Sequence, residues 1–190
     1  MRNLACLPLF LLCVGCALTP HDVAPAPPDN NLAVVFDIDG TLTTRAHAIW
    51  STRTGAVSAV QAYADAGYEV IYLSARHPLF QWHIPIWLER HGFPEGAIHV
   101  TESTTHRKDH VAFKHGVLEE YRDNGWKLVA AYGDSTTDFE AYANAGIDQN
   151  NVFALKPEGA QACEPGIRVK CLATWPEQLE HISNELRSPH

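Results

Sequence analysis

Apolar and polar residues follow one another along this chain in a pattern that predicts alternating strands and helices. Short apolar runs, typical of buried strands, occur at residues 32–36, 69–73, 97–100, 127–132 and 151–155. Segments with helical character follow them, at residues 55–66, 86–91, 110–122, 139–145 and 176–186. Strands that alternate with helices form a parallel sheet covered on both faces. We therefore predict a single doubly wound, Rossmann-like α/β domain.

Two proline-containing segments interrupt this pattern. Pro85 should break or restart the helix that runs to His91, so we expect that helix to be regular only from about Ile86. Pro165-Gly166 predicts a turn, and a hairpin around it, in the tail of the chain. The connections after the first two strands already hold predicted elements, which leaves too little room for a large cap domain.

The first strand ends in acidic residues. Asp37 and Asp39 follow the apolar run and precede Gly40. Because burying unpaired charge is costly, we expect both acids at the carboxyl end of the strand, in the crevice where open α/β sheets bind ligands. Residues i and i+2 of an extended chain point to the same side, so one carboxylate could attack a substrate while the other handles the proton. Gly40 allows a sharp turn, and Thr41 offers a hydroxyl and a backbone N–H.

Two later strands carry polar residues at the same end. Ser74 and Arg76 follow the second strand, and Asp134 and Asp138 straddle a helix start after the fourth. Together with Asp37, these two acids make an oxygen-rich set of the kind that Mg²⁺ prefers, although either one alone could simply cap the helix. Arg76 could hold a phosphate through a bidentate contact, or form a surface salt bridge.

The string Phe-Asp-x-Asp-Gly-Thr-Leu-Thr at residues 36–43 resembles the first motif of the haloacid dehalogenase superfamily of phosphotransferases. The resemblance implies that Asp37 is a nucleophile and Asp39 a general acid/base. It also implies that Ser74 hydrogen-bonds the phosphoryl oxygens, and Thr41 is a candidate substrate contact beside it.

The same resemblance implies a metal site. Asp37, Asp134 and the backbone carbonyl of Asp39 are the expected direct ligands of Mg²⁺, and Asp138 is expected to bind directly or through water.

The superfamily also places a lysine near the nucleophile. Lys114 and Lys108 are the candidates. We prefer Lys114, which lies inside the predicted helix at 110–122 and follows the apolar Phe113, although either side chain could simply be solvated.

A narrower resemblance covers residues 32–158. The stretches that carry it are Gly55-Ala56, Gly67-Tyr68, residues 71–76, Gly92-Phe93-Pro94 and residues 132–146. They look like the lipin/Nir-type domain, in which lipins are Mg²⁺-dependent phosphatidate phosphatases and Nir-type members are phosphatidate-binding modules without catalytic residues. Lipins generally carry Asn where this chain has Asp134, so lipid specificity is less well founded than phosphatase activity.

The resemblance implies a Mg²⁺-dependent phosphomonoester hydrolase that works through an aspartyl-phosphate, with phosphatidate or a similar lipid phosphate as its substrate. Two alternatives remain open at this point. One is an exported phosphatase for small soluble phosphomonoesters, and the other is a non-catalytic phospholipid-binding module.

Charge and aromatic content bear on the partners. The 190 residues carry a formal net charge of −8, which argues against nucleic acid and against general attraction to anionic membranes. Trp50, Trp82 and Trp87 are candidates for contact with lipid at an interface, or ordinary core and surface aromatics.

Residues 1–15 resemble a bacterial lipoprotein signal. Arg2 precedes an apolar stretch at residues 4–14 that is too short to span a bilayer. Cys13-Val14-Gly15-Cys16 resembles the lipobox, in which cleavage precedes a lipid-bearing cysteine, here Cys16. An ordinary secretory signal cleaved slightly later is the alternative. Both interpretations predict export, and the first predicts a membrane-anchored lipoprotein that faces the periplasm.

The anchor would be followed by a tether. Residues 16–31 comprise the lipidated cysteine and a proline-rich segment expected to be extended, and residues 32–190 comprise the phosphatase domain. Within that domain Cys163 and Cys171 form an even pair, which suggests a disulfide in an exported protein; two free thiols are the alternative.

Overall fold

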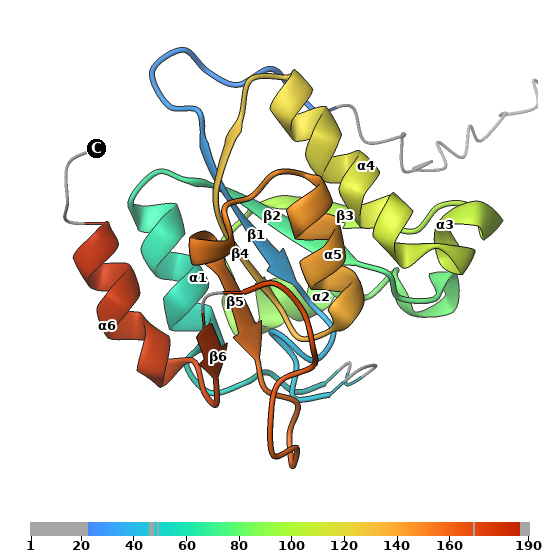
Figure 1. Ribbon diagram of the computed structural model, residues 1–190, viewed down its shortest axis with the longest axis vertical. Helices are drawn as coiled ribbons and strands as arrows, with labels where there is room; N and C mark the ends of the chain where they lie inside the picture. The colour runs from blue at the N-terminus through green and yellow to red at the C-terminus, as the bar shows by residue number, and fades with distance from the viewer. Residues whose placement is uncertain (1–22, 46–47, 49, 169, 187–190) are drawn as a thin grey trace, which may run out of the picture.

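A computed structural model describes residues 23–45, 48, 50–168 and 170–186. They form one six-stranded parallel sheet with the strand order β3-β2-β1-β4-β5-β6 (Figure 1). The strands are β1 (Leu32–Asp37), β2 (Glu69–Ser74), β3 (Ala97–Val100), β4 (Lys127–Gly133), β5 (Val152–Leu155) and β6 (Lys170–Leu172). The order reverses between β1 and β4, where a doubly wound sheet opens its ligand crevice.

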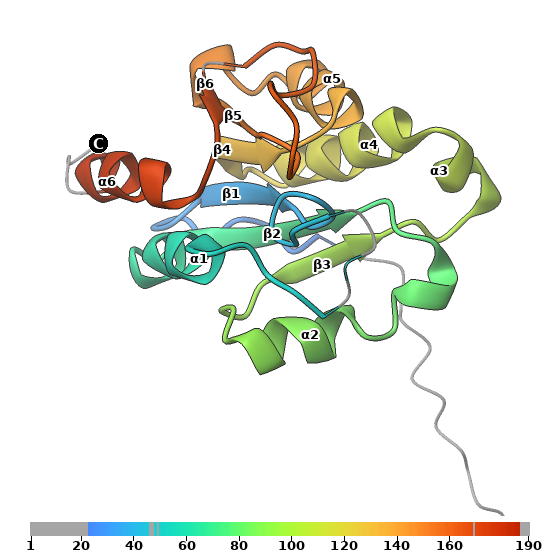
Figure 2. The same cartoon turned by 90° about the horizontal axis from the view of Figure 1, so that it is seen from below.

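Helices cover both faces of the sheet. They are α1 (Ala56–Asp65), α2 (Ile84–His91), α3 (Thr104–Lys108), α4 (His110–Asp123), α5 (Thr136–Asn144) and α6 (Pro176–Glu185), with single 3₁₀ turns η1 (Pro78–Phe80) and η2 (Gln149–Asn151). Figure 2 shows α1 and α6 on one side of the sheet and α4 and α5 on the other. The predicted single α/β domain without a large cap domain is confirmed.

The two helical layers explain why β1 is apolar throughout. Val34 and Phe36 belong to a core with α1 and α6, whereas Ala33 and Val35 belong to a second core with α4 and α5. Phe36 stacks on Tyr132 of β4 at 5.1 Å between ring centroids. A strand buried on both faces has no position left for a polar residue, so the first carboxylate appears only where the strand ends.

Three local differences from the predicted elements have physical causes. The predicted hairpin at Pro165-Gly166 is wrong, because the tail returns as β6, which pairs with β5 in parallel. Pro85 lies in the first turn of α2, where a helix needs no N–H donor, so α2 begins at Ile84 and not at Ile86. The short helix α3 was not predicted, since its five residues contain no apolar repeat.

Residues 23–31 lie against the domain and do not extend from it. Val23 is buried, Trp126 Nε1 donates a hydrogen bond to the Ala24 carbonyl, and the Ala26 N–H donates to the Asn124 carbonyl. This part of the predicted tether is therefore folded onto the domain. The signal segment at 1–15 and Cys16 lie outside the described residues.

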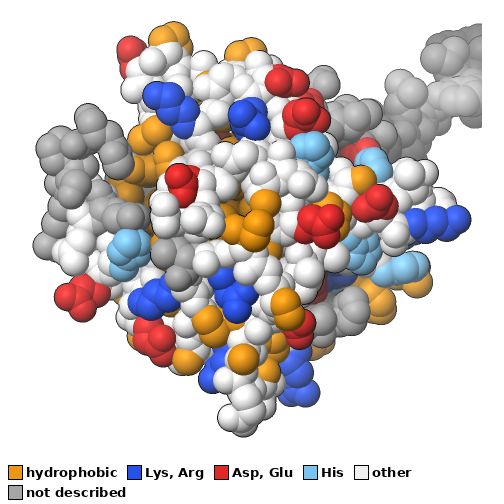
Figure 3. Space-filling view, viewed as in Figure 1, with side chains coloured by type: hydrophobic (Ala, Val, Ile, Leu, Met, Phe, Trp, Pro, Cys, Tyr) orange, Lys and Arg blue, Asp and Glu red, His pale blue; other side chains and the backbone are white. Residues whose placement is uncertain are grey.

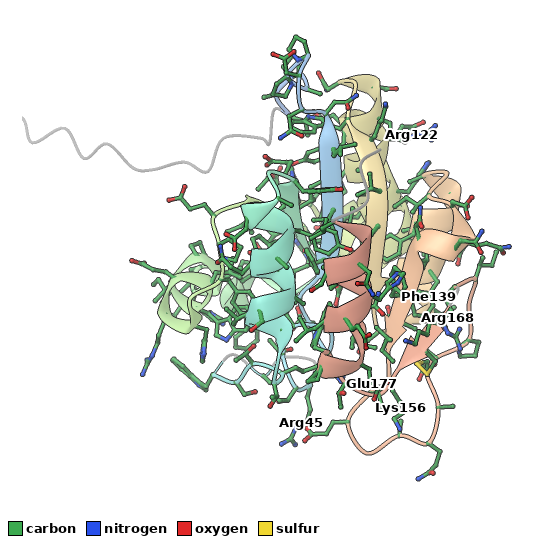
Figure 4. The ribbon with its side chains drawn as sticks, turned by 90° about the vertical axis from the view of Figure 1, so that its left-hand side faces the viewer. Arg45, Arg122, Phe139, Lys156, Arg168 and Glu177 are labelled. Carbon is green, nitrogen blue, oxygen red and sulfur yellow. A yellow bond between two sulfur atoms is a disulfide. The ribbon has the colours of Figure 1, made fainter. Side chains whose placement is uncertain are left out.

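The predicted disulfide between Cys163 and Cys171 is present (Figure 4). Cys171 lies in the edge strand β6 opposite Ala154 of β5, so the bond ties the loop after β5 to the last strand of the sheet. Arg168, in the same loop, lies over the ring of Phe139 on α5 at 5.5 Å (Figure 4).

None of the helices within the described residues is both long and apolar enough to span a bilayer. On the face shown in Figure 3, acidic and basic side chains are interspersed and hydrophobic side chains occur in small groups.

Candidate active site

A cavity of about 310 Å³ opens at the carboxyl ends of β1, β2 and β4. It is lined by Asp37, Asp39, Ala75, Arg76, His110, Lys114, Asp134, Ser135 and Thr137. Asp37, Asp39, Arg76 and Asp134 were predicted from three motifs far apart in sequence, and Lys114 was the preferred lysine. The parallel sheet brings them together because the carboxyl ends of neighbouring strands meet at one edge.

Asp37 is the last residue of β1 and is only 3% exposed. Its Oδ1 accepts a hydrogen bond from Lys114 Nζ at 2.5 Å, whereas its Oδ2 has no hydrogen-bond partner among the described residues. Burial and the neighbouring Asp138 carboxylate raise the pKa of Asp37 well above its usual range, although Lys114 acts in the opposite direction. One oxygen of this carboxylate is therefore held in place and the other is free to react.

Lys114 occupies the position predicted for the lysine near the nucleophile. It projects from α4, is buried, and contacts both Asp37 and Asp138. Burial alone would lower the pKa of Lys114, but the carboxylates of Asp138 and Asp37 outweigh burial and raise that pKa above its ordinary value. Lys114 therefore stays charged. Its two ion pairs connect the end of β1 with the first turn of α5. Lys108, the other candidate, is exposed at the end of α3.

Asp138 performs two structural tasks at the start of α5. Its Oδ1 accepts from Lys114, and its Oδ2 accepts hydrogen bonds from the backbone N–H groups of Asp134 and Ser135 and from Ser135 Oγ. The Ser135 and Asp138 side chains form a capping box. Both oxygens of Asp138 are engaged, so this residue holds the Asp134 loop in place.

Asp134 lies against the turn that follows β1. A Cβ atom built on Gly40, whose φ is +83°, would lie 2.0 Å from Asp134 Oδ2. Glycine is therefore required at position 40 for two reasons. The backbone is left-handed there, and the Asp134 carboxylate approaches so closely that a Cβ atom would not fit. Burial and the nearby Asp138 raise the pKa of Asp134 to about 7.

The Asp39 carboxylate is held by Arg76 and Ser74. Arg76 Nη2 donates to Oδ1 at 2.7 Å, Arg76 Nε donates at 3.1 Å to Oδ1 and at 3.2 Å to Oδ2, and Ser74 Oγ donates to Oδ2 at 2.8 Å. The salt bridge foreseen as an alternative for Arg76 exists, but it is buried and lies within the site. Arg76 Nη1 lies 3.3 Å from Nε2 of the buried His83.

The two threonines of the first motif have different places. Thr41 is fully buried and does not line the cavity, so its hydroxyl is not presented where a substrate contact was predicted. Thr43 Oγ1 instead accepts from the Gly40 N–H at 2.9 Å and donates to the Arg45 carbonyl at 2.7 Å. Thr43 thus fixes the turn that carries Asp39.

His110 is a cavity residue that the motifs did not predict. It precedes Lys114 by one helical turn on α4, and residues four apart share one face of a helix. That spacing is the signal in the sequence that could have identified it.

The three carboxylates fit a divalent cation. Oxygen atoms of Asp37, Asp134 and Asp138 lie within 4.8 Å of one another. The set holds more acids than the single ammonium of Lys114 can neutralise, and the raised pKa values of Asp37 and Asp134 reflect that excess. Hard oxygen donors are the ligands that Mg²⁺ prefers. Asp37, with its unpartnered Oδ2, and Asp134 are the residues best placed to hold such an ion.

Comparison with known proteins identifies the family. The family model described as "PITM 1-3, LNS2 domain" matches residues 34–156, which include most of β1, all of β2 to β5 and every motif of the site. The chain belongs to the LNS2 domain family. The LNS2 match confirms the expected resemblance to lipin-like domains.

The curated relatives are much longer proteins. Human membrane-associated phosphatidylinositol transfer protein 1 is 31% identical over 128 residues, which are 65% of this chain and 10% of that protein. The Drosophila melanogaster protein retinal degeneration B is 30% identical over 141 residues, or 72% of this chain and 11% of that protein. This LNS2 chain thus spans about a tenth of the length of these relatives.

Solved structures show the same fold at low sequence identity. The D,D-heptose 1,7-bisphosphate phosphatase from B. bronchiseptica, crystallised with magnesium and phosphate, superposes with a TM-score of 0.59 at 16% identity, and the match covers 82% of this chain and 99% of that one. The fold is that of the haloacid dehalogenase-like phosphatases, as the first motif predicted.

Proposed function

We propose that this LNS2 domain is a Mg²⁺-dependent phosphomonoester hydrolase that works through an aspartyl-phosphate. The observation that carries the proposal is the state of Asp37, which lines the cavity. One of its carboxylate oxygens is fixed by Lys114, and the other has no hydrogen-bond partner among the described residues. A module that only binds phosphate has no use for a buried carboxylate, which would repel the ligand. Asp134 and the family resemblance support the metal.

In the proposed reaction Asp37 attacks phosphorus in line, and the bond from phosphorus to the ester oxygen breaks. Asp39 gives its proton to that leaving oxygen, so the alcohol departs neutral. Asp39 then takes a proton from water as the water oxygen attacks the aspartyl-phosphate, which releases inorganic phosphate and restores the Asp37 carboxylate. Mg²⁺, held by Asp37 and Asp134, would neutralise charge on the transferred group when bound.

Asp39 must be freed and protonated before it can act as an acid, since Arg76 and Ser74 both donate to it and stabilise its ionised form. A phosphate dianion entering the cavity offers these donors a more highly charged acceptor. We propose that Arg76 and Ser74 shift part of their hydrogen bonding to the substrate phosphate. This exchange would relate the contact seen with Asp39 to the phosphate-binding role predicted for both residues.

The substrate we propose is phosphatidate or a similar lipid phosphate. The absence of a large cap leaves the cavity open to a bulky ester, and the curated relatives are named as membrane-associated phosphatidylinositol transfer proteins. We further propose that the protein is exported and carries lipid on Cys16, which would keep it at a membrane. An exported phosphatase for small soluble phosphomonoesters remains the second candidate, because two of the structural neighbours that share the fold are named as phosphatases of small sugar phosphates.

The deciding experiment measures phosphate release from phosphatidate vesicles and from a soluble phosphomonoester, with and without Mg²⁺. Wild type should turn over phosphatidate only with Mg²⁺. Asp37→Asn keeps the shape of the side chain and should lose at least about a thousandfold in rate, as removal of a nucleophile does.

Asp37→Asn should keep the circular dichroism spectrum of the wild type, since it removes a buried charge and no volume. Turnover of the soluble ester alone would select the second candidate. Vesicle binding without any turnover would select a lipid-binding module, and near-normal Mg²⁺-dependent activity in Asp37→Asn would refute the assigned mechanism.

A further inference from the structure

Large hydrophobic side chains gather at one place on the surface. Within the described residues, five of the six large hydrophobic side chains that are strongly exposed come from the loop after β1 and from the segment between β2 and the first turns of α2. They are Trp50, Leu79, Phe80, Trp82 and Ile86; the sixth, Ile167, lies in the loop after β5. Trp50 is 71% exposed and Trp82 68%. Single exposed apolar residues are ordinary, but a group of them marks an interaction site.

The two parts of this surface meet at His83. The Trp50 ring lies 6.5 Å from the His83 ring and the Trp82 ring lies 5.2 Å from it. Trp50 and Ile86 also line one cavity of about 150 Å³, which Arg90 and His91 border. We call this group the Trp50–Trp82 surface. At the right of Figure 3, hydrophobic and histidine side chains lie next to one another.

The Trp50–Trp82 surface adjoins the candidate active site. His83 lies close to both tryptophan rings and contacts Arg76, and Arg76 holds Asp39. The loops that carry the surface are the same ones that leave β1 and β2 at the edge of the sheet where the site opens. Whatever binds this surface is therefore brought to the mouth of the active site.

Charge favours a bilayer with anionic lipids as the occupant. Residues 44–54 and 75–91 hold four arginines and a single acid, Glu89, in a chain with a net charge of −8. Arg76 is buried and paired with Asp39, and Arg45 is paired with Glu158. The exposed Arg90 borders the cavity that Trp50 lines, and it is the cationic side chain that this surface presents. Tryptophans flanked by cationic side chains are the pattern found at membrane–water interfaces. The two tryptophans also project from the surface, whereas the anchors of protein–protein interfaces lie in packed pockets.

We infer that the Trp50–Trp82 surface inserts into the interfacial layer of an anionic bilayer and seats the active site against it. This inference deepens the proposed function, because it identifies how a lipid phosphate would reach Asp37. The first test does not need turnover.

The first test measures quenching of tryptophan fluorescence in the full-length protein by vesicles of brominated phosphatidylcholine with phosphatidylglycerol. All forms carry Cys16→Ser, because Trp126 contacts Ala24 and an N-terminal anchor would bring that ring near the bilayer. Wild type and Asp37→Asn should be quenched equally. Trp50→Phe combined with Trp82→Phe should lose the quenching. Equal quenching in that double variant, or none in wild type, overturns the inference.

The second test measures turnover. Trp50→Ser combined with Trp82→Ser should lose about tenfold or more on phosphatidate vesicles, since each tryptophan contributes interfacial burial. The same variant should match wild type on a soluble phosphomonoester. Ile167→Ser, which removes an exposed apolar side chain away from the surface, is the matched control and should match wild type on both substrates.

Equal losses of the double Ser variant and Ile167→Ser on vesicles would overturn the inference. If wild type is quenched as expected but turns over no phosphatidate, the docking surface stands and the proposed lipid substrate fails.

Discussion

The ionised form of the Asp134 carboxyl is unfavourable in this site when no cation is bound. The pKa of this carboxyl is raised from the ordinary 3.8 to about 7 by burial and by Asp138. Between these pH values the folded protein holds a proton that the unfolded chain has released, so the free energy of unfolding of the metal-free protein should fall as pH rises from about 4 to 7. A cation that replaces the proton should reverse that loss.

Asp134→Asn should therefore stabilise the metal-free protein at pH 8, by on the order of 2 kcal/mol. The measurement is urea unfolding at pH 5 and pH 8, with and without Mg²⁺. Mg²⁺ should raise the midpoint of the wild type at pH 8 and leave that of Asp134→Asn unchanged. A variant less stable than wild type at pH 8 without Mg²⁺ would contradict the assigned electrostatics.

Gly40 allows a test of the close approach that forms the cluster. Gly40→Ala places a methyl group on Asp134 and should lower phosphatase activity by about a hundredfold or more, because small displacements of reacting groups are costly.

Gly92→Ala is the matched control for Gly40→Ala. Gly92 also has a left-handed backbone, with φ +77°, but no atom lies within 4 Å of the added methyl group. Both variants should lose about 1 kcal/mol of stability from the backbone. Only Gly40→Ala should lose activity, and equal activity in the two would remove the case for the Asp134 contact.

The acids were predictable from the sequence, but their partners were not. Asp37, Asp39 and Asp134 could be predicted because charge is excluded from a strand buried on both faces and must appear at its end. The pairing of Arg76 with Asp39 depends on the relative depth of two loops in different parts of the chain, which no local pattern specifies. The same limit applies to Thr41. Its hydroxyl suggested a substrate contact, but tertiary packing buries the side chain.

At the scale of elements, β6 is the part of the sheet most dependent on a covalent bond. It has three residues, lies at the edge of the sheet, and is joined to the preceding loop by Cys163–Cys171. Its short, mostly exposed sequence gave no strand signal, which explains why a hairpin was predicted there. The five longer or more apolar strands were predicted because burial on both faces leaves a continuous hydrophobic run.

Cys163→Ser combined with Cys171→Ser should lower the free energy of unfolding by roughly 2 to 3 kcal/mol, the loop-entropy value for a short enclosed loop. The measurement is denaturant unfolding of the oxidised wild type and the double variant. Wild type in reducing agent should match the variant, and alkylation of two thiols in unreduced, unfolded wild type would contradict the bond. The active-site edge belongs to β1, β2 and β4, so turnover should be nearly unchanged at low temperature.

At the scale of the whole molecule, the proposed lipid on Cys16 should matter for one class of substrate. Removal of the lipid in Cys16→Ser should change turnover of phosphatidate in vesicles, because attachment fixes the distance and orientation of the domain relative to a bilayer. Both forms should act equally on a soluble phosphomonoester. Unchanged mass and unchanged membrane fractionation in Cys16→Ser would contradict the lipid anchor. A chain shortened for such work should keep Val23, since residues 23–31 pack on the domain.

The place where residues 23–31 lie also determines which way an anchored domain faces. Asn31 donates to the Gly125 carbonyl and Trp126 donates to the Ala24 carbonyl, so the chain joins the domain beside the start of β4 (Figure 1). Asp37 and Asp134 lie at the other end of the strands. The six residues from 17 to 22 span at most about 20 Å.

An anchor at Cys16 would then hold the active site away from the bilayer that holds the lipid chain. The Trp50–Trp82 surface would face a second bilayer on the opposite side. With the proposed anchor and substrate, the protein would be a spacer between two membranes, and the lipid that it acts on would belong to the facing one. In a mixture of two vesicle populations, enzyme attached to one population should hydrolyse phosphatidate in the other. Phosphatidate in the vesicles that carry the enzyme should remain.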